Sequence, residues 1–194
     1  MKQIHFATKN PGKVHSLQLV LSEYDLEIIQ VPLEMPEPRS DFLDEIARTK
    51  VLAAYAAIQK PCIAVDAGCF VDSLHGFPGS YVNYVLRTIG IDGILRLVEG
   101  KPREASLKSA LAYYDGTEEV PRCFSSGIEG TLSLTARGEE RDYHWSRLFK
   151  IFIPRGREKT LAEMSPEEYQ AWRHETSREN SFARDFGQWY AQRV

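Results

Sequence analysis

The sequence lacks an apolar run of about 18 residues, the length at which a membrane-spanning helix is expected. Its N-terminus also lacks a signal-peptide pattern. We therefore expect no membrane association and a cytoplasmic location. Positive charge is not in surplus, because the 194 residues carry a formal net charge of -3. Nucleic acid is for that reason not expected as a partner, although a small polyanion could bind at a local basic spot.

Cysteine is also scarce. Cys62, Cys69 and Cys123 form an odd count without short paired spacings, which argues against a disulfide framework or a zinc site. All three lie among apolar residues, so we expect buried thiols. The length fits one domain or two closely joined lobes, and the sequence has no internal repeat, linker or low-complexity tract.

Hydrophobic patterning and turn residues predict a mixed α/β domain with a long central sheet. Strands are predicted over residues 3–7, 26–33, 62–66 (continuing extended to 74), 106–115, 121–134 and 149–154. Helices are predicted over residues 12–24, 42–59, 81–89 and 92–98, and through the charged C-terminal third. Ser40 or Asp41 is expected to cap the helix over 42–59. Phe182, Phe186 and Trp189 recur at helical spacing and are expected in the core.

The stretch "FATKNPGKV" joins the first predicted strand to the first predicted helix. Such a junction is suited to phosphate, because the first helical N–H groups lack partners and the helix dipole favours an anion. Gly12 would let the backbone approach closely, and Lys13 with Lys9 would add positive charge. An ordinary turn explains "NPGK" equally well. The stretch is not a Walker A loop, because the glycine spacing and the Lys-Ser/Thr pair are absent.

Two acids stand out. Glu37 lies in a Pro-rich loop, and Asp66 ends the apolar run "CIAVD". Two carboxylates beside a triphosphate could bind Mg²⁺, which takes few protein oxygens and shares its other positions with water and phosphate. A helix cap or a solvated loop position is the alternative, and these residues alone favour it.

Several ordered blocks resemble the inosine triphosphate pyrophosphatase family over nearly the whole chain. They read "FATKNPGKV", "MPEP", "DEIARTKVLAA", "AVDAGCFVDSLHGFPGSYV", "GILRLVEG" and "FIPRGREKTLAEMSPEE". The resemblance implies a single domain over 1–194 with an elongated mixed sheet flanked by helices, and two lobes around a nucleotide cleft. It also implies a homodimer that cleaves ITP, dITP and XTP to the monophosphate and pyrophosphate with Mg²⁺.

The resemblance implies roles for individual residues. Glu37 and Asp66 would be the metal-binding and catalytic carboxylates. The substrate-binding residues would be Thr8, Lys9, Asn10, Gly12, Lys13, Lys50, Ala67 and His174.

The chain departs from the family pattern at the base-reading end. Val65 replaces one of two adjacent acids, and "RDYHWSRLFKIF" replaces a Gly-Phe-Gly-Tyr/Trp-Asp-Pro run. Tyr143 or Trp145 could stack on a base, or both could pack against the sheet. In the last motif the differences are Tyr169 for a Lys, Arg173 for a Ser and Glu175 for an Arg. Arg173 or Arg178 could compensate for the lost arginine.

Two hypotheses follow from these differences. In the first, the protein is an active pyrophosphohydrolase with an altered base preference. In the second, it is a nucleotide-sensing subunit with weak or absent hydrolysis that regulates a partner effector protein, for example in stress or antiviral defence. Losing a catalytic carboxylate or a charge-assisted donor typically costs about 10²- to 10³-fold in rate, so the sequence leaves both open.

Overall fold

The computed structural model describes residues 2–179 and 181–193, which form a seven-stranded mixed sheet flanked by helices. The strand order is β2-β1-β3-β5-β6-β7, and β4 pairs with β3 beside this path. The strands are β1 (Lys2–Ala7), β2 (Leu26–Val31), β3 (Cys62–Val71), β4 (Pro78–Gly79), β5 (Glu104–Tyr114), β6 (Arg122–Leu132) and β7 (Phe152–Pro154). β1 is parallel to β2 and β3, and the other pairings are antiparallel.

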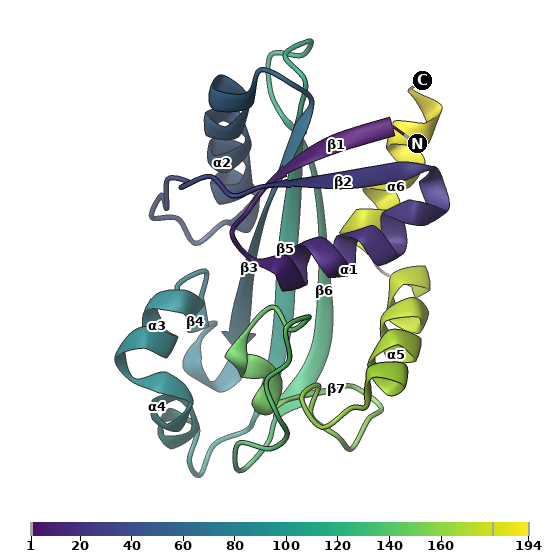
Figure 1. The fold of residues 1–194 in the computed structure, drawn as a ribbon. Helices are drawn as coiled ribbons and strands as arrows, with labels where there is room; N and C mark the ends of the chain where they lie inside the picture. The colour runs from purple at the N-terminus through teal and green to yellow at the C-terminus, as the bar shows by residue number, and fades with distance from the viewer. Residues whose placement is uncertain (1, 180, 194) are drawn as a thin grey trace.

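Helices cover both faces of the sheet (Figure 1). The α-helices are α1 (Pro11–Leu21), α2 (Leu43–Ile58), α3 (Val82–Thr88), α4 (Gly90–Leu97), α5 (Pro166–Glu179) and α6 (Phe182–Gln192). Three short 3₁₀ helices are η1 (Ser22–Tyr24), η2 (Asp72–Leu74) and η3 (Arg147–Lys150). None of the described helices is long and apolar enough to cross a membrane.

The alternation of side chains along β3 explains why the two faces carry different helices. Ile63 and Val65 point to one face, where they pack with α1 and α6. Cys62 and Ala64 point to the other face, where they pack with the small residues of α2 and β5. A third core cluster joins α3, α4, η3, β7 and α5 at the far end of the long strands, where Figure 1 shows these elements gathered. The predicted two-lobed α/β architecture is therefore confirmed.

Most predicted elements are confirmed, and the differences lie at their ends. The strand predicted over 149–154 is shorter, because residues 149–150 belong to η3 and only residues 152–154 pair with β6. The extended stretch predicted to residue 74 ends at residue 71, where η2 begins. The predicted cap of α2 is wrong, since the N-cap is Phe42 without a side-chain hydrogen bond. Ser40 Oγ instead accepts from the Phe42 N–H at 3.0 Å and donates to Glu45 at 2.7 Å.

The predicted core positions are confirmed. Phe182 and Phe186 are buried, and Trp189 packs against the same cluster. Cys62 and Cys69 are buried free thiols, and burial raises the pKa of each to about 12. Cys123 is also free but only half-buried.

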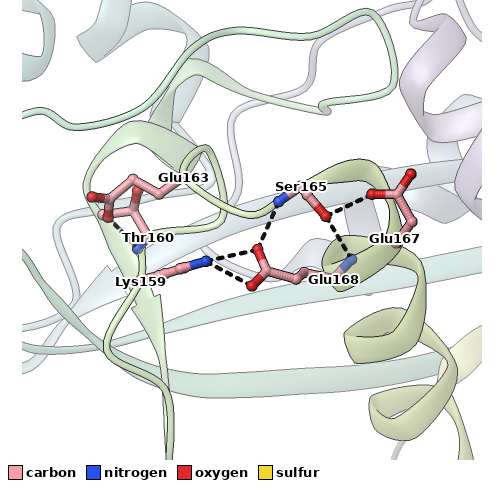
Figure 2. A network of polar contacts seen from close by, with 6 residues as sticks. All are labelled: Lys159, Thr160, Glu163, Ser165, Glu167 and Glu168. Atoms are coloured by element: carbon pink, nitrogen blue, oxygen red, sulfur yellow. Dashed lines mark hydrogen bonds and ion pairs between the residues drawn. The ribbon is translucent and has the colours of Figure 1, made fainter.

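The start of α5 is fixed by a capping box (Figure 2). The Ser165 N–H donates to Glu168 Oε2 at 2.8 Å, and the Glu168 N–H donates to Ser165 Oγ at 3.2 Å. These reciprocal bonds satisfy helix-start donors that otherwise lack partners. Lys159 Nζ binds both Glu168 carboxylate oxygens, at 2.6 and 2.9 Å, so the preceding loop is tied to the same point. The rotation of α5 about its axis, and hence which residues face inward, depends on this start.

Ser165→Ala should remove the side-chain acceptor at the start of α5. We expect the free energy of unfolding to fall by about 1 kcal/mol, the usual cost of losing a helix N-cap. Urea unfolding followed by circular dichroism measures this change. The control is Gln170→Ala, at an exposed position in the same helix, for which the change should stay within about 0.5 kcal/mol. Equal losses for the two variants would contradict a capping role for Ser165.

Candidate functional site

A cleft of about 1000 Å³ opens between the two lobes. Its lining comes from the turn after β1, the loop before α2, the middle of β3 and β5, the residues before and within η3, and α5. Its cationic side chains are Lys9, Lys13, Arg39, Lys50, Arg87, Lys108, Arg141 and Arg173. The acids that line it are Glu34, Glu37, Asp66 and Asp142. Cations thus outnumber acids two to one here, although the whole chain is slightly acidic.

The cleft exists because β1 and β3 separate after a short stretch of pairing. Their pairing consists of His5 with Cys62 and Phe6 with Ile63, after which β1 ends and the chain turns away. On the same side, β3 next pairs with β4 at Cys69. The backbone between these points therefore has an open edge toward the cleft, and Asp66 lies there. Asp66 was expected at a strand end, but it lies mid-strand, opposite Ala110 of β5.

Asp66 faces α2, because it follows Cys62 and Ala64 on the same side of β3. Its carboxylate accepts a hydrogen bond from Lys50 Nζ of α2 at 2.6 Å, and both residues are buried. The same Nζ lies 3.0 Å from Glu37 Oε2. Glu37, Lys50 and Asp66 come from three separate segments and meet at one point. All three were predicted site residues.

The pKa values of two lysines at this point are shifted in opposite directions. Burial lowers the pKa of Lys50, but the attraction of Asp66 and Glu37 outweighs it, so the pKa is raised overall. Burial lowers the pKa of Lys13, and the attraction of Asp66 only partly opposes it. Lys13 Nζ donates to the Val65 carbonyl at 3.2 Å. Lys50 thus has two carboxylate partners, whereas Lys13 donates to a backbone oxygen next to them.

The donor set at this point fits Mg²⁺. Glu37 and Asp66 both approach one Lys50 ammonium, so their oxygens are close enough to serve one cation. Among the described residues no group of three or more His, Cys, Asp or Glu side chains could hold a metal. Mg²⁺ is commonly held by one or two carboxylates together with substrate phosphates and water, so two protein ligands suffice.

The turn after β1 is built as a helix start, with Asn10 as the N-cap of α1. Asn10 Oδ1 accepts from the Lys13 N–H at 3.1 Å, and Thr8 Oγ1 accepts from the Asn10 N–H at 3.1 Å. Thr8, Lys9, Asn10 and Lys13 all line the cleft. The predicted strand-turn-helix junction is confirmed, and its polar groups open onto the same space as Asp66.

This turn is also fastened to the segment of residues 141–149, which precedes and includes most of η3. Asn10 Nδ2 donates to the Trp145 carbonyl at 2.9 Å, and Trp145 Nε1 donates to Ser16 Oγ of α1 at 2.6 Å. A Cβ on Gly12 would lie 2.6 Å from the His144 carbonyl oxygen. Gly12 is not among the residues that line the cleft, and the close approach it permits is to this segment.

The aromatic residues of the segment 141–149 divide between cleft and core. Trp145 lines the cleft, with Lys13 Nζ 6.0 Å and the Arg173 guanidinium 5.6 Å from its ring centre. Tyr143 packs inward, with its ring centre 5.1 Å from that of Tyr169. Of the two side chains considered for stacking on a base, only Trp145 is placed to do so among the residues that line the cleft.

Comparison with known proteins agrees with this architecture. Residues 4–182 match the model of the Ham1 family. The chain belongs to the Ham1 family. Relatives include a dITP/XTP pyrophosphatase of Pyrococcus horikoshii, 39% identical over 89% of this chain and 90% of the relative. A second, from Methanopyrus kandleri, is 37% identical over 99% of this chain and 98% of the relative, and is also named a dITP/XTP pyrophosphatase.

Solved structures show the same Ham1 fold. A Ham1 protein from Coxiella burnetii superposes with a TM-score of 0.80 at 20% identity, covering 99% of this chain and all of that one. A dITP/XTP pyrophosphatase from Mycobacterium abscessus gives a TM-score of 0.67 at 27% identity, covering 89% and 94%. The family resemblance inferred from the sequence motifs is therefore confirmed.

Two of the positions at which this Ham1 chain departs from the family motif, Tyr169 and Glu175, are not among the residues that line the cleft. Tyr169 is buried in an aromatic cluster with Tyr143 and His144. Glu175 forms an ion pair with Arg157 and is not among the residues that line the cleft. His174, a predicted substrate-binding residue, is also outside the cleft lining, and its Nδ1 lies 3.8 Å from Glu23 on the surface. Among the described residues, His174 is therefore not part of the cleft lining.

Sequence reasoning missed part of the lining. Ala67 was predicted and lies in the cleft wall, but Lys108 of the neighbouring strand and Arg87 of α3 were not considered. Arg141 and His144 also line the cleft. The sequence "RDYHWSR" signals a polar and aromatic segment, but nothing local to it tells which side chains face a cleft formed by distant elements.

Asn10→Asp keeps the hydrogen bond that caps α1 but removes the one to the Trp145 carbonyl. Aspartate can still cap α1, but it has no donor for the Trp145 carbonyl. We expect the segment 141–149 to open more often, because an unpaired buried polar group costs about 1 to 2 kcal/mol, which is about 5- to 30-fold in the open population.

Trypsin cleavage after Arg141 and Arg147 under native conditions measures that opening. The matched control is Asn83→Asp on α3, which makes the same charge change at an exposed position. Equal cleavage rates in the two variants would show that the bond from Asn10 does not hold the segment.

Proposed function

We propose that the protein hydrolyses purine nucleoside triphosphates of the ITP, dITP and XTP class to the monophosphate and pyrophosphate. The observation that carries the proposal is the cluster of Lys13, Lys50, Glu37 and Asp66 in one cation-rich cleft. A triphosphate needs cations, and its hydrolysis needs a carboxylate beside them. The names of the Pyrococcus and Methanopyrus relatives support the same reaction.

In this proposal the phosphates lie at the β1–α1 turn. Lys13 of α1 and Lys50 of α2 supply positive charge, and Lys9 adds a third, solvent-exposed charge. The N-terminus of the eleven-residue helix α1 contributes its dipole and the Thr8 hydroxyl a polar contact. Asn10 and Gly12 act mainly by holding the turn in shape, since their contacts are to the segment 141–149.

The reaction forms a bond from a water oxygen to the α-phosphorus and breaks the bond from that phosphorus to the bridging oxygen. Pyrophosphate leaves with the bonding electron pair. Asp66 accepts the proton of the attacking water at a carboxylate oxygen, while Lys13 and Lys50 stabilise the charge that develops on the phosphates. Glu37 and Asp66 would hold Mg²⁺, which when bound supplies further positive charge to the phosphates. Lys50 keeps these two carboxylates together.

A second function is favoured by the departures from the family motif. Val65 leaves Asp66 without a neighbouring acid, and Tyr169 is buried where a lysine was expected. A protein so altered could bind the nucleotide without turning it over and regulate an effector protein. Association as a homodimer and a cytoplasmic location remain predictions; sedimentation velocity tests the former.

The direct test combines turnover with binding. Purified protein is mixed with Mg²⁺ and ITP, dITP, XTP, ATP or GTP, and pyrophosphate release is measured alongside calorimetric affinity. We expect turnover of at least one 6-oxopurine triphosphate. Tight binding without pyrophosphate would reject the hydrolase in favour of the sensor, and absence of binding would reject both.

Asp66→Asn and Lys13→Ala should differ in their effects. We expect the first to lower kcat by about 10²- to 10³-fold, because it removes the proton acceptor and a metal ligand, with a smaller change in affinity. We expect the second to lower both kcat and affinity, because Lys13 binds the phosphates before and during reaction. Circular dichroism confirms folding of each variant. An Asp66→Asn variant with full activity would remove this residue from the mechanism.

A further inference from the structure

Lys108 of β5 is an exposed cation in the lining of the cleft, and the proposed function gives it no role. Within residues 2–179 and 181–193, no ion pair joins its ammonium to an acid, whereas Lys50 has two carboxylate partners. A cleft focuses the field of a charge that it contains. The ammonium of Lys108 is therefore available to an anionic ligand.

The strand register places Lys108 on the same face of the sheet as Asp66. Asp66 lies opposite Ala110 of β5, and Gly68 lies opposite Lys108. Because alternate residues of a strand share a face and paired residues point the same way, Asp66, Gly68 and Lys108 all face α2. A residue on the neighbouring strand and two positions along is within reach of a long side chain. Lys108 can therefore contact a ligand that is bound at Asp66.

Phe70 holds the ammonium in place. Its ring covers Gly68, since a Cβ on Gly68 would lie 2.9 Å from Phe70 Cε2. Lys108 Nζ lies 4.8 Å from the centre of the same ring. A cation–π contact of this kind orients the ammonium but uses none of its three N–H donors. Lys108 Nζ is thus kept beside the part of β3 that directly follows Asp66, with its donors free for a ligand.

The contacts along β3 give an order to the cations. Lys13 Nζ donates to the carbonyl of Val65, the residue before Asp66, and lies 6.0 Å from the Trp145 ring centre. Lys108 pairs with the second residue after Asp66. Trp145 packs against the core cluster on the α1 face, whereas Lys108 lies on the α2 face. A nucleotide with its nucleoside toward Trp145 and its α-phosphorus at Asp66 would direct its terminal phosphate toward Lys108.

We propose that Lys108 binds the terminal phosphate of the substrate and makes the site prefer triphosphates to diphosphates. This inference rests on the proposed function. A lysine ammonium is a compact charge that suits phosphate oxygens. When pyrophosphate leaves with the bonding electron pair, Lys108 stays protonated and stabilises the added negative charge. A nucleoside diphosphate has no phosphate at this position, so Lys108 does not assist its cleavage.

The test uses Lys108→Met, which keeps an apolar stem beside Phe70 but removes the charge, and Lys108→Arg, which keeps the charge. The matched control is Lys101→Met, which removes a lysine charge at an exposed position outside the cleft lining. Each protein is assayed with Mg²⁺ and either ITP or IDP. Calorimetry with magnesium pyrophosphate measures the site of the leaving group separately, and circular dichroism confirms folding.

We expect Lys108→Met to lower kcat/KM for ITP by about 10-fold, the scale of one hydrogen bond to a charged group. Affinity for pyrophosphate should fall by a similar factor. The kcat/KM for IDP should change less than about 3-fold, as should all values for Lys101→Met and the ITP-to-IDP preference of Lys108→Arg. Equal losses with ITP and IDP would overturn the proposal, and so would an unchanged kcat/KM for ITP.

Failure of the hydrolase proposal can be told apart from failure of this one. If the wild-type protein releases no pyrophosphate from ITP, the proposed hydrolysis fails. Lys108 is then judged from the calorimetric affinities of the same variants for ITP, IDP and pyrophosphate. Loss of affinity by Lys108→Met for ITP and pyrophosphate, but not for IDP, would support the role of Lys108 in a protein that only binds nucleotides. Unchanged affinities, or no binding of these compounds to the wild type, would reject it.

Discussion

The site depends on the point at which β1 separates from β3. Two residue pairs join these parallel strands, and beyond them the sheet has an open edge before β4 begins. A buried carboxylate at this edge would be costly alone, but Asp66 is compensated by Lys50 of α2, which packs against it. Glu37 reaches the same ammonium from a loop. One short strand pairing and one lysine thus bring the two acids together.

The turn after β1 and the segment 141–149, which both line the cleft, are in direct contact. Asn10 caps α1, whose first residues line the cleft, and its side-chain amide also donates to the Trp145 carbonyl. Gly12 leaves room for the same segment. The start of α1 and the segment 141–149 are therefore held together by direct contacts.

The sequence predicted much of this because the relevant signals are local. Apolar runs and turn residues identified the strands and helices, and the motif around Thr8 and Lys13 identified the strand-turn-helix junction. The capping box of Ser165 and Glu168 is also readable as a Ser-x-x-Glu spacing. The sequence did not reveal which distant residue each of these local features contacts. Asn10 binds a carbonyl 135 residues away, and the place of Asp66 depends on where a different strand ends.

The C-terminal motif shows the same limit. Tyr169 and Trp172, three residues apart, are buried on the inward face of α5. His174 and Glu175 therefore lie on the outward side of this helix, where they approach Glu23 and Arg157. Motif matching predicted that His174 binds the substrate, and the structure places this side chain at the surface beside Glu23. Arg173 is retained on the cleft side by stacking on Trp145 and Trp172. Tyr169 packs against the rings of Tyr143, His144 and Phe149 in the segment 141–149, so the two differences from the family motif contact each other.

The central claim is that a nucleotide lies along the cleft with its phosphates between Lys13, Lys50 and Asp66. A crystal structure with Mg²⁺ and a non-hydrolysable ITP analogue tests it most directly. The account predicts phosphate oxygens within hydrogen-bond distance of both lysine Nζ atoms and the base beside Arg173 and Trp145. Phosphates bound instead at Arg141 and Arg173, with Lys13 and Lys50 making no contact to the nucleotide, would contradict it.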